Sequence, residues 1–203
     1  MQYANILILC EYSIAMSRFP ESREAIRVLI EEGMSVVNPD SKIRIINFGN
    51  DISHEMEWIE DADKFDKIAM FRGSDTGVSN IYHALNGITS IISSHPHEDI
   101  KWIIVLCTYC GSSDYAELLT SDTRDFLKSY CTCIIVYGDE QIQSKIPGFV
   151  VSSDSIFTAG SDSESNRFAE LMRDLTYPKS ILHKKTNFPL DEEFKEDLTD
   201  PYN

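Results

Sequence analysis

The feature that most constrains the fold is a series of five short apolar runs, rich in β-branched residues, along the first two thirds of the chain. Three of the runs are continuous rather than alternating, which is typical of strands buried on both faces. Amphipathic segments with apolar residues three and four apart lie between them. This alternation predicts an α/β fold with a Rossmann-like, doubly wound, mostly parallel sheet. The predicted strands are residues 5–10, 42–48, 67–71, 102–107 and 133–138.

Four amphipathic segments are predicted as helices: residues 21–37, 79–94, about 114–130, and 163–175. The second segment opens on Ser79, a residue type suited to N-capping. The side chains expected to face the core are Ala25, Val28, Leu29 and Met34 in the first helix, Ile81, Leu85, Ile88 and Ile92 in the second, and Leu118, Leu119, Phe126 and Leu127 in the third.

Two features refine this division of the chain: one break in the alternation of strands and helices, and one change in composition near the end. No helix separates the predicted strands at 42–48 and 67–71, so a hairpin with one antiparallel edge strand is expected there. A weak strand is expected at 148–153, before the last helix. Residues 1–177 are therefore predicted to be one domain. Residues 178–203, acidic and with only scattered apolar anchors, are predicted to be a flexible or loosely docked tail.

The net charge of the chain limits the classes of partner that it can bind. With 33 acidic and 18 basic residues, the formal net charge is -15, which repels phosphate backbones and anionic lipid headgroups. No nucleic acid and no membrane partner is therefore expected. The sequence has no apolar run of the ~18 residues that a membrane-spanning helix needs, and it has no leader pattern at its start. We expect an intracellular protein.

The five cysteines, an odd number, do not form a disulfide framework and are expected to be reduced. Cys107 and Cys110 form a C-x-x-C, and Cys131 and Cys133 a C-x-C, so a four-thiolate zinc site has to be considered. Cys107 should end one strand whereas Cys131 and Cys133 should open the next. Parallel neighbours place those positions on the order of 15 to 20 Å apart, which no single ion bridges.

The stretch that follows the first predicted strand, "CEYSIAMS", almost contains the metal-binding pattern D-x-S-x-S. Glu11 stands at the aspartate position, Ser13 fits, and Ala15 replaces the second serine. In a doubly wound sheet, ligands bind at the carboxyl ends of the strands where the strand order reverses. Two more loops should reach this edge: one contains Thr76 and Ser79, and the other has Tyr109 where an aspartate is expected.

These three loops, in this order, resemble those of a von Willebrand factor A domain, and the resemblance covers roughly residues 3–177. It implies a vestigial cation site in which hard anionic ligands are missing, so no cofactor and no resident metal is expected, with Mg²⁺ as the open alternative. Glu11 and Ser13 are then expected to hydrogen-bond loop amides instead of an ion. The vestigial positions are Glu11, Ser13, Ala15, Thr76, Ser79 and Tyr109.

Among A domains, the sequence is most similar to the ubiquitin-receptor subunit of the 26S proteasome regulatory particle. The similarity lies in the ordered set "EYSIAM", "NPDSKIRIINFGND", "TGVSNIYHAL", "KWIIVLCTYCGSSD" and "CIIVYGDE". It implies a non-enzymatic scaffold of the cytoplasm and nucleus whose partners are other regulatory-particle subunits. Ubiquitin is left open as a partner, because the acidic tail lacks the Leu-Ala stripe of that family's ubiquitin-interacting helix. Tyr12, Trp58 and Tyr109 would supply aromatic interface anchors.

Two alternatives compete with this interpretation. One is a metal-dependent A-domain binding module of the tellurium-resistance or signalling type, which would use Glu11, Ser13 and Ser79 to hold Mg²⁺. The other is an enzyme. The sequence has no G-x-G-x-x-G and no P-loop, its five histidines form no i, i+4 pair, and Ser13 and Ser79 have no base that the sequence identifies. We therefore expect no enzymatic activity.

Overall fold

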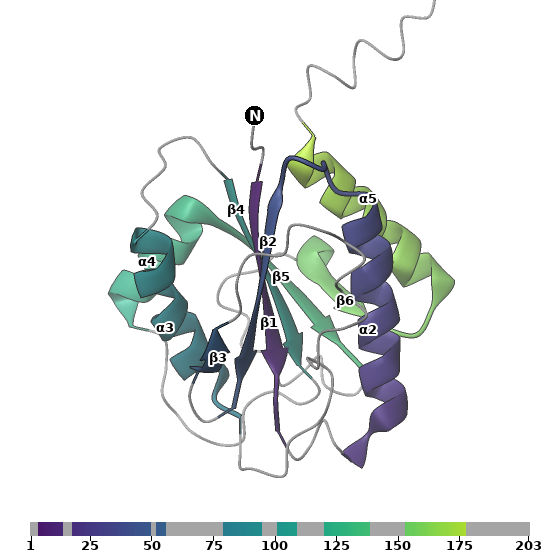
Figure 1. The fold of residues 1–203 in the computed structure, drawn as a ribbon, viewed down its shortest axis with the longest axis horizontal. Helices are drawn as coiled ribbons and strands as arrows, with labels where there is room; N and C mark the ends of the chain where they lie inside the picture. The colour runs from purple at the N-terminus through teal and green to yellow at the C-terminus, as the bar shows by residue number, and fades with distance from the viewer. Residues whose placement is uncertain are drawn as a thin grey trace, which may run out of the picture.

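The computed structural model describes residues 4–13, 18–49, 52–55, 79–94, 101–108, 120–138 and 153–177, the side chains of residues 52–55, 101 and 153 excepted. Helices and strands alternate along these ranges (Figure 1). The strands are β1 (Ala4–Glu11), β2 (Lys42–Phe48), β3 (Ile52–Glu55), β4 (Lys101–Thr108), β5 (Cys131–Tyr137) and β6 (Ile156–Thr158). The helices are α2 (Pro20–Ser35), α3 (Ile81–Ser93), α4 (Ser121–Tyr130) and α5 (Asp162–Thr176), with a 3-10 turn, η4 (Ser153–Ser155), before β6.

The strands form one sheet in the order β3-β2-β1-β4-β5-β6. Strands β2, β1, β4, β5 and β6 are mutually parallel, as the continuous apolar runs predict. The chain adds strands on one side of β1 and then, from β4 onward, on the other, so the strand order reverses between β1 and β4. The doubly wound architecture is confirmed.

The strand next to β2 comes from residues that the sequence analysis did not predict as a strand. The antiparallel strand expected at residues 67–71 lies outside the described residues. The strand that pairs antiparallel with β2 is β3, whose register is irregular beside Asn47 and Phe48. Its sequence, "ISHE", has no apolar run to reveal it. The weak strand expected at 148–153 lies outside the described residues except for Ser153, which begins η4, and the described strand before α5 is β6.

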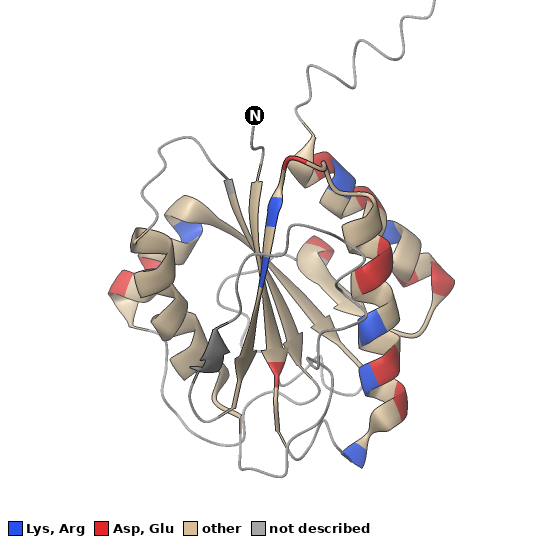
Figure 2. Ribbon diagram, viewed as in Figure 1, with Lys and Arg blue, Asp and Glu red and all other residues tan. Residues whose placement is uncertain are grey.

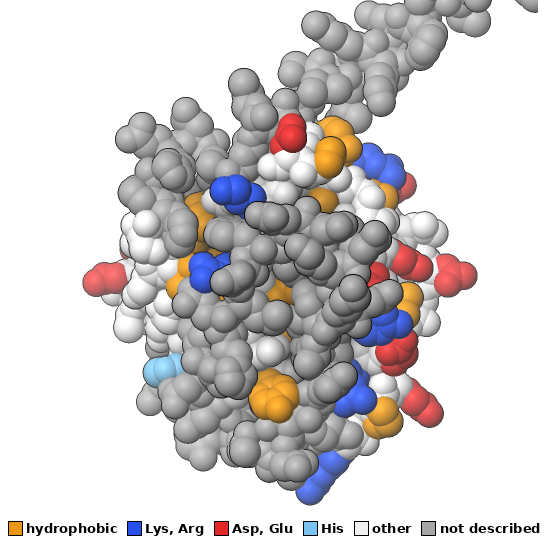
Figure 3. Space-filling view, in the orientation of Figure 1, with side chains coloured by type: hydrophobic (Ala, Val, Ile, Leu, Met, Phe, Trp, Pro, Cys, Tyr) orange, Lys and Arg blue, Asp and Glu red, His pale blue; other side chains and the backbone are white. Residues whose placement is uncertain are grey.

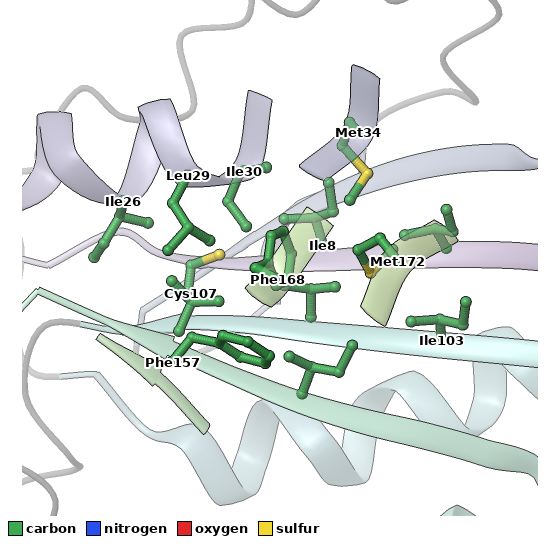
Figure 4. Packing of buried hydrophobic residues seen from close by; sticks show 14 of the residues in the cluster. Ile8, Ile26, Leu29, Ile30, Met34, Ile103, Cys107, Phe157, Phe168 and Met172 are labelled. Atoms are coloured by element: carbon green, nitrogen blue, oxygen red, sulfur yellow. The ribbon is translucent and has the colours of Figure 1, made fainter. Parts of the chain in front are cut away.

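Helices α2 and α5 cover one face of the sheet (Figure 4). The Phe168 ring of α5 meets the Phe157 ring of β6 edge to face, with 5.2 Å between centroids. It also lies against Gly33 of α2, where a Cβ atom would come within 2.1 Å of the ring. Gly33 therefore allows the two helices to approach closely.

Helices α3 and α4 cover the opposite face. Ile81, Leu85, Ile88 and Ile92 of α3 are buried there, as predicted, and so is Leu127 of α4. Helix α4 begins later than its predicted start, at Ser121, because the Thr120 hydroxyl accepts from the Thr123 amide and caps it.

The predicted stripe of α2 is wrong at Val28, which is 38% exposed. The buried residues follow the i, i+3, i+4, i+7 spacing from a different start. Ala25 is half-buried beside them. The buried residues of α2 are Ile26, Leu29, Ile30, Gly33 and Met34.

The exposed edge of β6 is covered by side chains of α5. The Glu164 carboxylate accepts from the Thr158 amide at 3.1 Å, and the Arg167 guanidinium donates to the Ile156 carbonyl at 2.5 Å. Arg167 also donates to Glu164 and lies over the Phe157 ring at 4.0 Å. The backbone of the last strand thus has partners on its outer side as well as from β5.

The described part of the chain ends at Tyr177, one residue after α5, so the predicted tail 178–203 lies outside it. The end of α5 is linked to the turn between α2 and β2, because the Asn38 amide donates to the buried Thr176 hydroxyl at 3.1 Å. Each described helix is too short or too polar to span a bilayer.

Candidate functional site

The carboxyl ends of β1 and β4 meet where the strand order reverses, at the place that the sequence predicts for a site. Cys10 and Cys107 are paired in register, and Glu11 and Thr108 follow them at the ends of the two strands. Because side chains alternate along a strand, Glu11 shares the face of Leu7 and Leu9, which is covered by α3.

The Glu11 carboxylate is the centre of a cluster of hydroxyl groups. Its Oε1 accepts from the Ser13 hydroxyl at 2.5 Å and from the Ser79 hydroxyl at 2.8 Å. Its Oε2 accepts from the Thr108 hydroxyl at 2.5 Å. Three hydroxyl donors to Glu11, which the sequence analysis did not predict, are therefore part of the site. Hydrogen bonds of this length to a carboxylate are of the strong, charge-assisted kind.

All four side chains are closed off from water. Glu11 is 2% exposed, Ser13 and Thr108 are 1% exposed, and Ser79 is 5% exposed. A buried carboxyl group is costly unless hydrogen bonds replace its hydration. The three hydroxyls supply those bonds, so the cluster is satisfied internally.

Backbone hydrogen bonds frame the cluster. The Tyr12 amide donates to the Phe48 carbonyl at 2.6 Å, and the Asn80 amide donates to the Gly49 carbonyl at 2.8 Å. A Cβ atom at Gly49 would lie 3.1 Å from the Tyr12 carbonyl oxygen. The end of β2 is thereby held between the loop after β1 and the start of α3.

Ser79 does not cap α3, contrary to the prediction. The N-cap is Asn80, whose side-chain oxygen accepts from the His83 amide at 2.9 Å. The Ser79 hydroxyl is directed to Glu11 instead. Two adjacent polar residues thus have separate functions, which the preference for serine at N-caps cannot distinguish.

Thr108 is the member of the cluster that the sequence prediction missed. The predicted third-loop position is Tyr109, one residue further along. A usable signal was present: Thr108 has the same parity as Ile104 and Leu106, whose side chains face α3. The parallel register then places it beside Glu11.

Of the predicted site positions, the structure brings together Glu11, Ser13 and Ser79. Ala15, Thr76 and Tyr109 lie outside the described residues. Of the predicted aromatic anchors, Tyr12 is half-buried, whereas Trp58 and Tyr109 lie outside the described residues.

The arrangement of these oxygens can be compared with what a hard cation requires. Mg²⁺ favours octahedral coordination by one or two carboxylates together with waters. Here one carboxylate is present, and three of its roughly four acceptor positions receive hydroxyl hydrogens. Across the described ranges, no three His, Cys, Asp or Glu side chains form a group that could hold a metal ion. The described residues, as arranged, do not fit an octahedral Mg²⁺ site.

The four described cysteines lie on both faces of the sheet: Cys10 and Cys107 on one, and Cys131 and Cys133 on the other. The register pairs Cys131 with Trp102 and Cys107 with Val136, so Cys107 and Cys131 sit at opposite ends of the β4–β5 pair, as the argument against a shared zinc ion requires. Burial raises the pKa of Cys131 and Cys133 to about 12, with Cys133 adding to the effect on Cys131. The pKa of Cys107 is raised by burial and by its neighbour Cys10. None of these thiols is poised as a nucleophile at neutral pH.

Comparison with solved structures identifies the fold. Proximal thread matrix protein 1 from the mussel byssus is 16% identical with a TM-score of 0.63, and the match covers 85% of this chain and 48% of that chain. A von Willebrand factor type A protein from Catenulispora acidiphila is 11% identical with a TM-score of 0.59, covering 86% of this chain and 42% of that one. The chain spans about half the length of the mussel protein.

The A domain of SpRpn10 is 14% identical with a TM-score of 0.55, and the match covers 83% of this chain and 95% of that chain. Another structure of the mussel protein, 15% identical with a TM-score of 0.60, has a zinc-occupied MIDAS motif, and the match covers 85% of this chain and 48% of that one. No protein-family model and no curated protein sequence matches the chain. The chain thus has the fold of von Willebrand factor A domains.

Proposed function

We propose that the chain is a non-enzymatic protein-interaction module that needs no metal ion and acts as an architectural subunit of the proteasome regulatory particle. The observation that carries this proposal is the buried Glu11 cluster. At the edge where A domains hold a cation, the described carboxylate is satisfied by the chain's own hydroxyls. A carboxylate that is buried and hydrogen-bonded in this way is not an exposed nucleophile.

The assignment to the proteasome rests on two supports. The first is the ordered set of sequence motifs similar to the ubiquitin-receptor subunit. The second is the SpRpn10 A domain, which this chain covers almost completely, in contrast to the longer mussel protein. On this proposal the protein works in the cytoplasm and nucleus, its partners are other regulatory-particle subunits, and ubiquitin is an additional candidate.

The outward surface of α3 is the contact area that suits such a role. Its sequence has no Asp, Glu, Lys or Arg, and Figure 2 shows it without coloured charge. Tyr82 and Ile91 are half-buried at its flanks, and Ser90 is exposed. The centres of protein interfaces are depleted in charged residues.

Affinity purification from the native source followed by mass spectrometry tests the proposal. Proteasome regulatory-particle subunits should co-purify with the wild-type chain, and the yield should not change when EDTA is present. The variant Ser90→Lys places a charge on α3 and should reduce the yield of these subunits. The matched control, Ser35→Lys, changes an exposed serine at the end of α2 and should leave the yield unchanged. Recovery of the wild-type chain without any proteasome subunit would contradict the proposal.

A metal-dependent binding module is the second candidate, because a structural neighbour has zinc in its MIDAS motif and because Glu11, Ser13 and Ser79 do converge here. Calorimetry with Mg²⁺ and Mn²⁺ separates the two candidates. Binding with a Kd below about 1 mM would favour the metal-dependent module.

A further inference from the structure

We propose that the Glu11 carboxylate replaces a divalent cation as the group that joins the loops at this sheet edge, and that the length of its side chain excludes the ion. The inference concerns bonds within the fold. It stands whether or not the chain binds the proteasome.

The connectivity of the cluster supports this replacement. Ser13 comes from the loop after β1, Ser79 precedes α3, and Thr108 ends β4. Ser79 and Thr108 lie 68 and 97 residues from Glu11 in the sequence. A cation at such an edge would draw oxygen ligands from separate loops to one point. Here one carboxylate draws the same kind of hydroxyl oxygens to itself.

The length of the residue 11 side chain determines whether its carboxylate or a cation can occupy the point where the hydroxyls converge. Oε1 lies within hydrogen-bonding distance of both Ser13 and Ser79, so a carboxylate oxygen occupies the position at which these hydroxyls converge. An aspartate has one methylene fewer and would withdraw its carboxylate by about 1.5 Å, one C–C bond. That withdrawal would break hydrogen bonds and leave a space lined by one carboxylate and three hydroxyl oxygens.

Burial of the cluster keeps the Glu11 carboxylate in the position that a cation would occupy. The four side chains are almost fully enclosed, so the hydrogen bonds do not compete with water. A cluster that has no ion to gain or lose keeps the ends of β1 and β4 joined to Ser79, just before α3, regardless of the Mg²⁺ or Ca²⁺ concentration.

The substitution Glu11→Asp in the full chain is the decisive experiment, with Mg²⁺ and Mn²⁺ as probes. Without metal, we expect the Tm of Glu11→Asp to fall by roughly 5 to 10 °C, because hydroxyls lose their acceptor. With 10 mM Mn²⁺, we expect its Tm to recover by about 5 °C or more, whereas the Tm of the wild type should change by less than about 1 °C with either ion or with EDTA.

Two further variants control this comparison. Glu11→Gln keeps the length of the side chain but replaces one acceptor oxygen by a donor, so its Tm should fall and should show no recovery with Mn²⁺. Adding Ser79→Ala to Glu11→Asp removes one hydroxyl ligand and should weaken Mn²⁺ binding by about tenfold, as measured by calorimetry.

Three results would overturn the proposal. The first is a rise of several degrees in the wild-type Tm with Mg²⁺ or Mn²⁺, which would show that the ion binds beside Glu11. The second is a cation response of Glu11→Asp no larger than that of the wild type. The third is failure of Glu11→Asp to fold even at 10 mM Mn²⁺ while Glu11→Gln folds. None of these results depends on which proteins co-purify with the chain.

Discussion

Helices α2 and α5 cover one face of the sheet, and α3 and α4 cover the other, but the outward surfaces of the two layers differ in charge. Acidic and basic side chains gather over α2 and α5, on the right of Figures 2 and 3. Helix α3 has none, and its neighbour α4 has four: Asp122, Arg124, Asp125 and Lys128. The charged residues of the first layer are Glu21, Arg23, Glu24, Arg27, Glu31 and Glu32 in α2, and Asp162, Glu164, Arg167, Glu170, Arg173 and Asp174 in α5.

This difference in outward charge indicates that the buried side of a helix and its exposed side have independent compositions in this fold. Both layers bury aliphatic side chains against the same strands, so both are needed for stability. Among the described residues, the ion pairs between side chains lie in the α2/α5 layer: Arg27 with Glu24 and Glu31, and Arg167 with Glu164. The α3 surface needs less desolvation on contact with another protein, and it is therefore the better candidate for an interface.

The largest expected effect tests whether the two cores contribute equally. Phe168→Ala in the α2/α5 layer should lower the free energy of unfolding by about 3 to 5 kcal/mol, because it removes a fully buried ring that fills the space beside Gly33 and Phe157. Ile88→Ala in the α3/α4 layer should cost about 2 to 4 kcal/mol. Urea denaturation measures both. A larger loss for Ile88→Ala would reverse the expected ranking of the two cores.

The second prediction concerns a glycine-to-alanine substitution in each layer, for which we expect changes in the free energy of unfolding of opposite sign. Gly33→Ala should destabilise by about 1 to 3 kcal/mol, because its methyl group would meet the Phe168 ring. Gly87→Ala, at a half-buried position inside α3, should stabilise by up to about 1 kcal/mol through helix propensity.

A double-mutant cycle checks the cause of the first of these effects. Gly33→Ala should cost less in a Phe168→Leu background, in which the ring is gone, than in the wild type. An unchanged cost would mean that contact with the ring is not responsible.

The third prediction concerns pH and the ion pair of the α2/α5 layer. The hydrogen bond from Arg167 lowers the pKa of Glu164 below its usual 4.5, with a smaller contribution from the Thr158 amide, while burial acts in the opposite direction. Because the folded-state pKa is lowered, the contribution of Glu164 to stability is fully present above about pH 4.5 and is lost as pH falls through the folded-state pKa.

Glu164→Gln measures that contribution. At pH 7 it should cost about 1 kcal/mol or less, the range for a partly exposed pair. The difference from the wild type should shrink at pH 3, as followed by urea midpoints. A pH-independent difference would show that the carboxylate charge is not the cause.

The smallest expected effect lies on the outer surface of α2. Arg27 donates to Glu24 at 2.5 Å and to Glu31 one turn further along. Arg27→Gln should cost only a few tenths of a kcal/mol per pair, and the cost should decrease in 1 M NaCl because salt screens exposed charges. Thermal unfolding at two salt concentrations measures it. A cost that does not change with salt would indicate lost packing of the Arg27 stem instead.

Much of the fold could be predicted because burial leaves a repeating pattern. The inner strands β1, β4 and β5 are continuous apolar runs, and the inward residues of α3 follow one helical stripe. The strands at the edges, β3 and β6, are short and carry polar residues, so no such pattern identifies them. Val28 was misassigned because adjacent apolar residues in α2 permit two neighbouring stripes.

The position of the site in the fold could be predicted from the sequence, but only some of its residues could. Strand order and chain direction locate the edge, and local sequence identifies Glu11 and Ser13. Thr108 is adjacent to Glu11 only through the register of β1 and β4, which the sequence does not state. The use of Ser79 as a donor to Glu11 rather than as an N-cap depends on tertiary contact in the same way.

The covering of β6 by α5 has a consequence beyond the stability of one domain. A bare edge strand is a template on which other chains can add strands, and this leads to fibrils or misassembly. Since Glu164 and Arg167 already hold the outward amide of Thr158 and the outward carbonyl of Ile156, that route to aggregation is obstructed at this edge. At high protein concentration, this edge is therefore protected from unintended sheet extension.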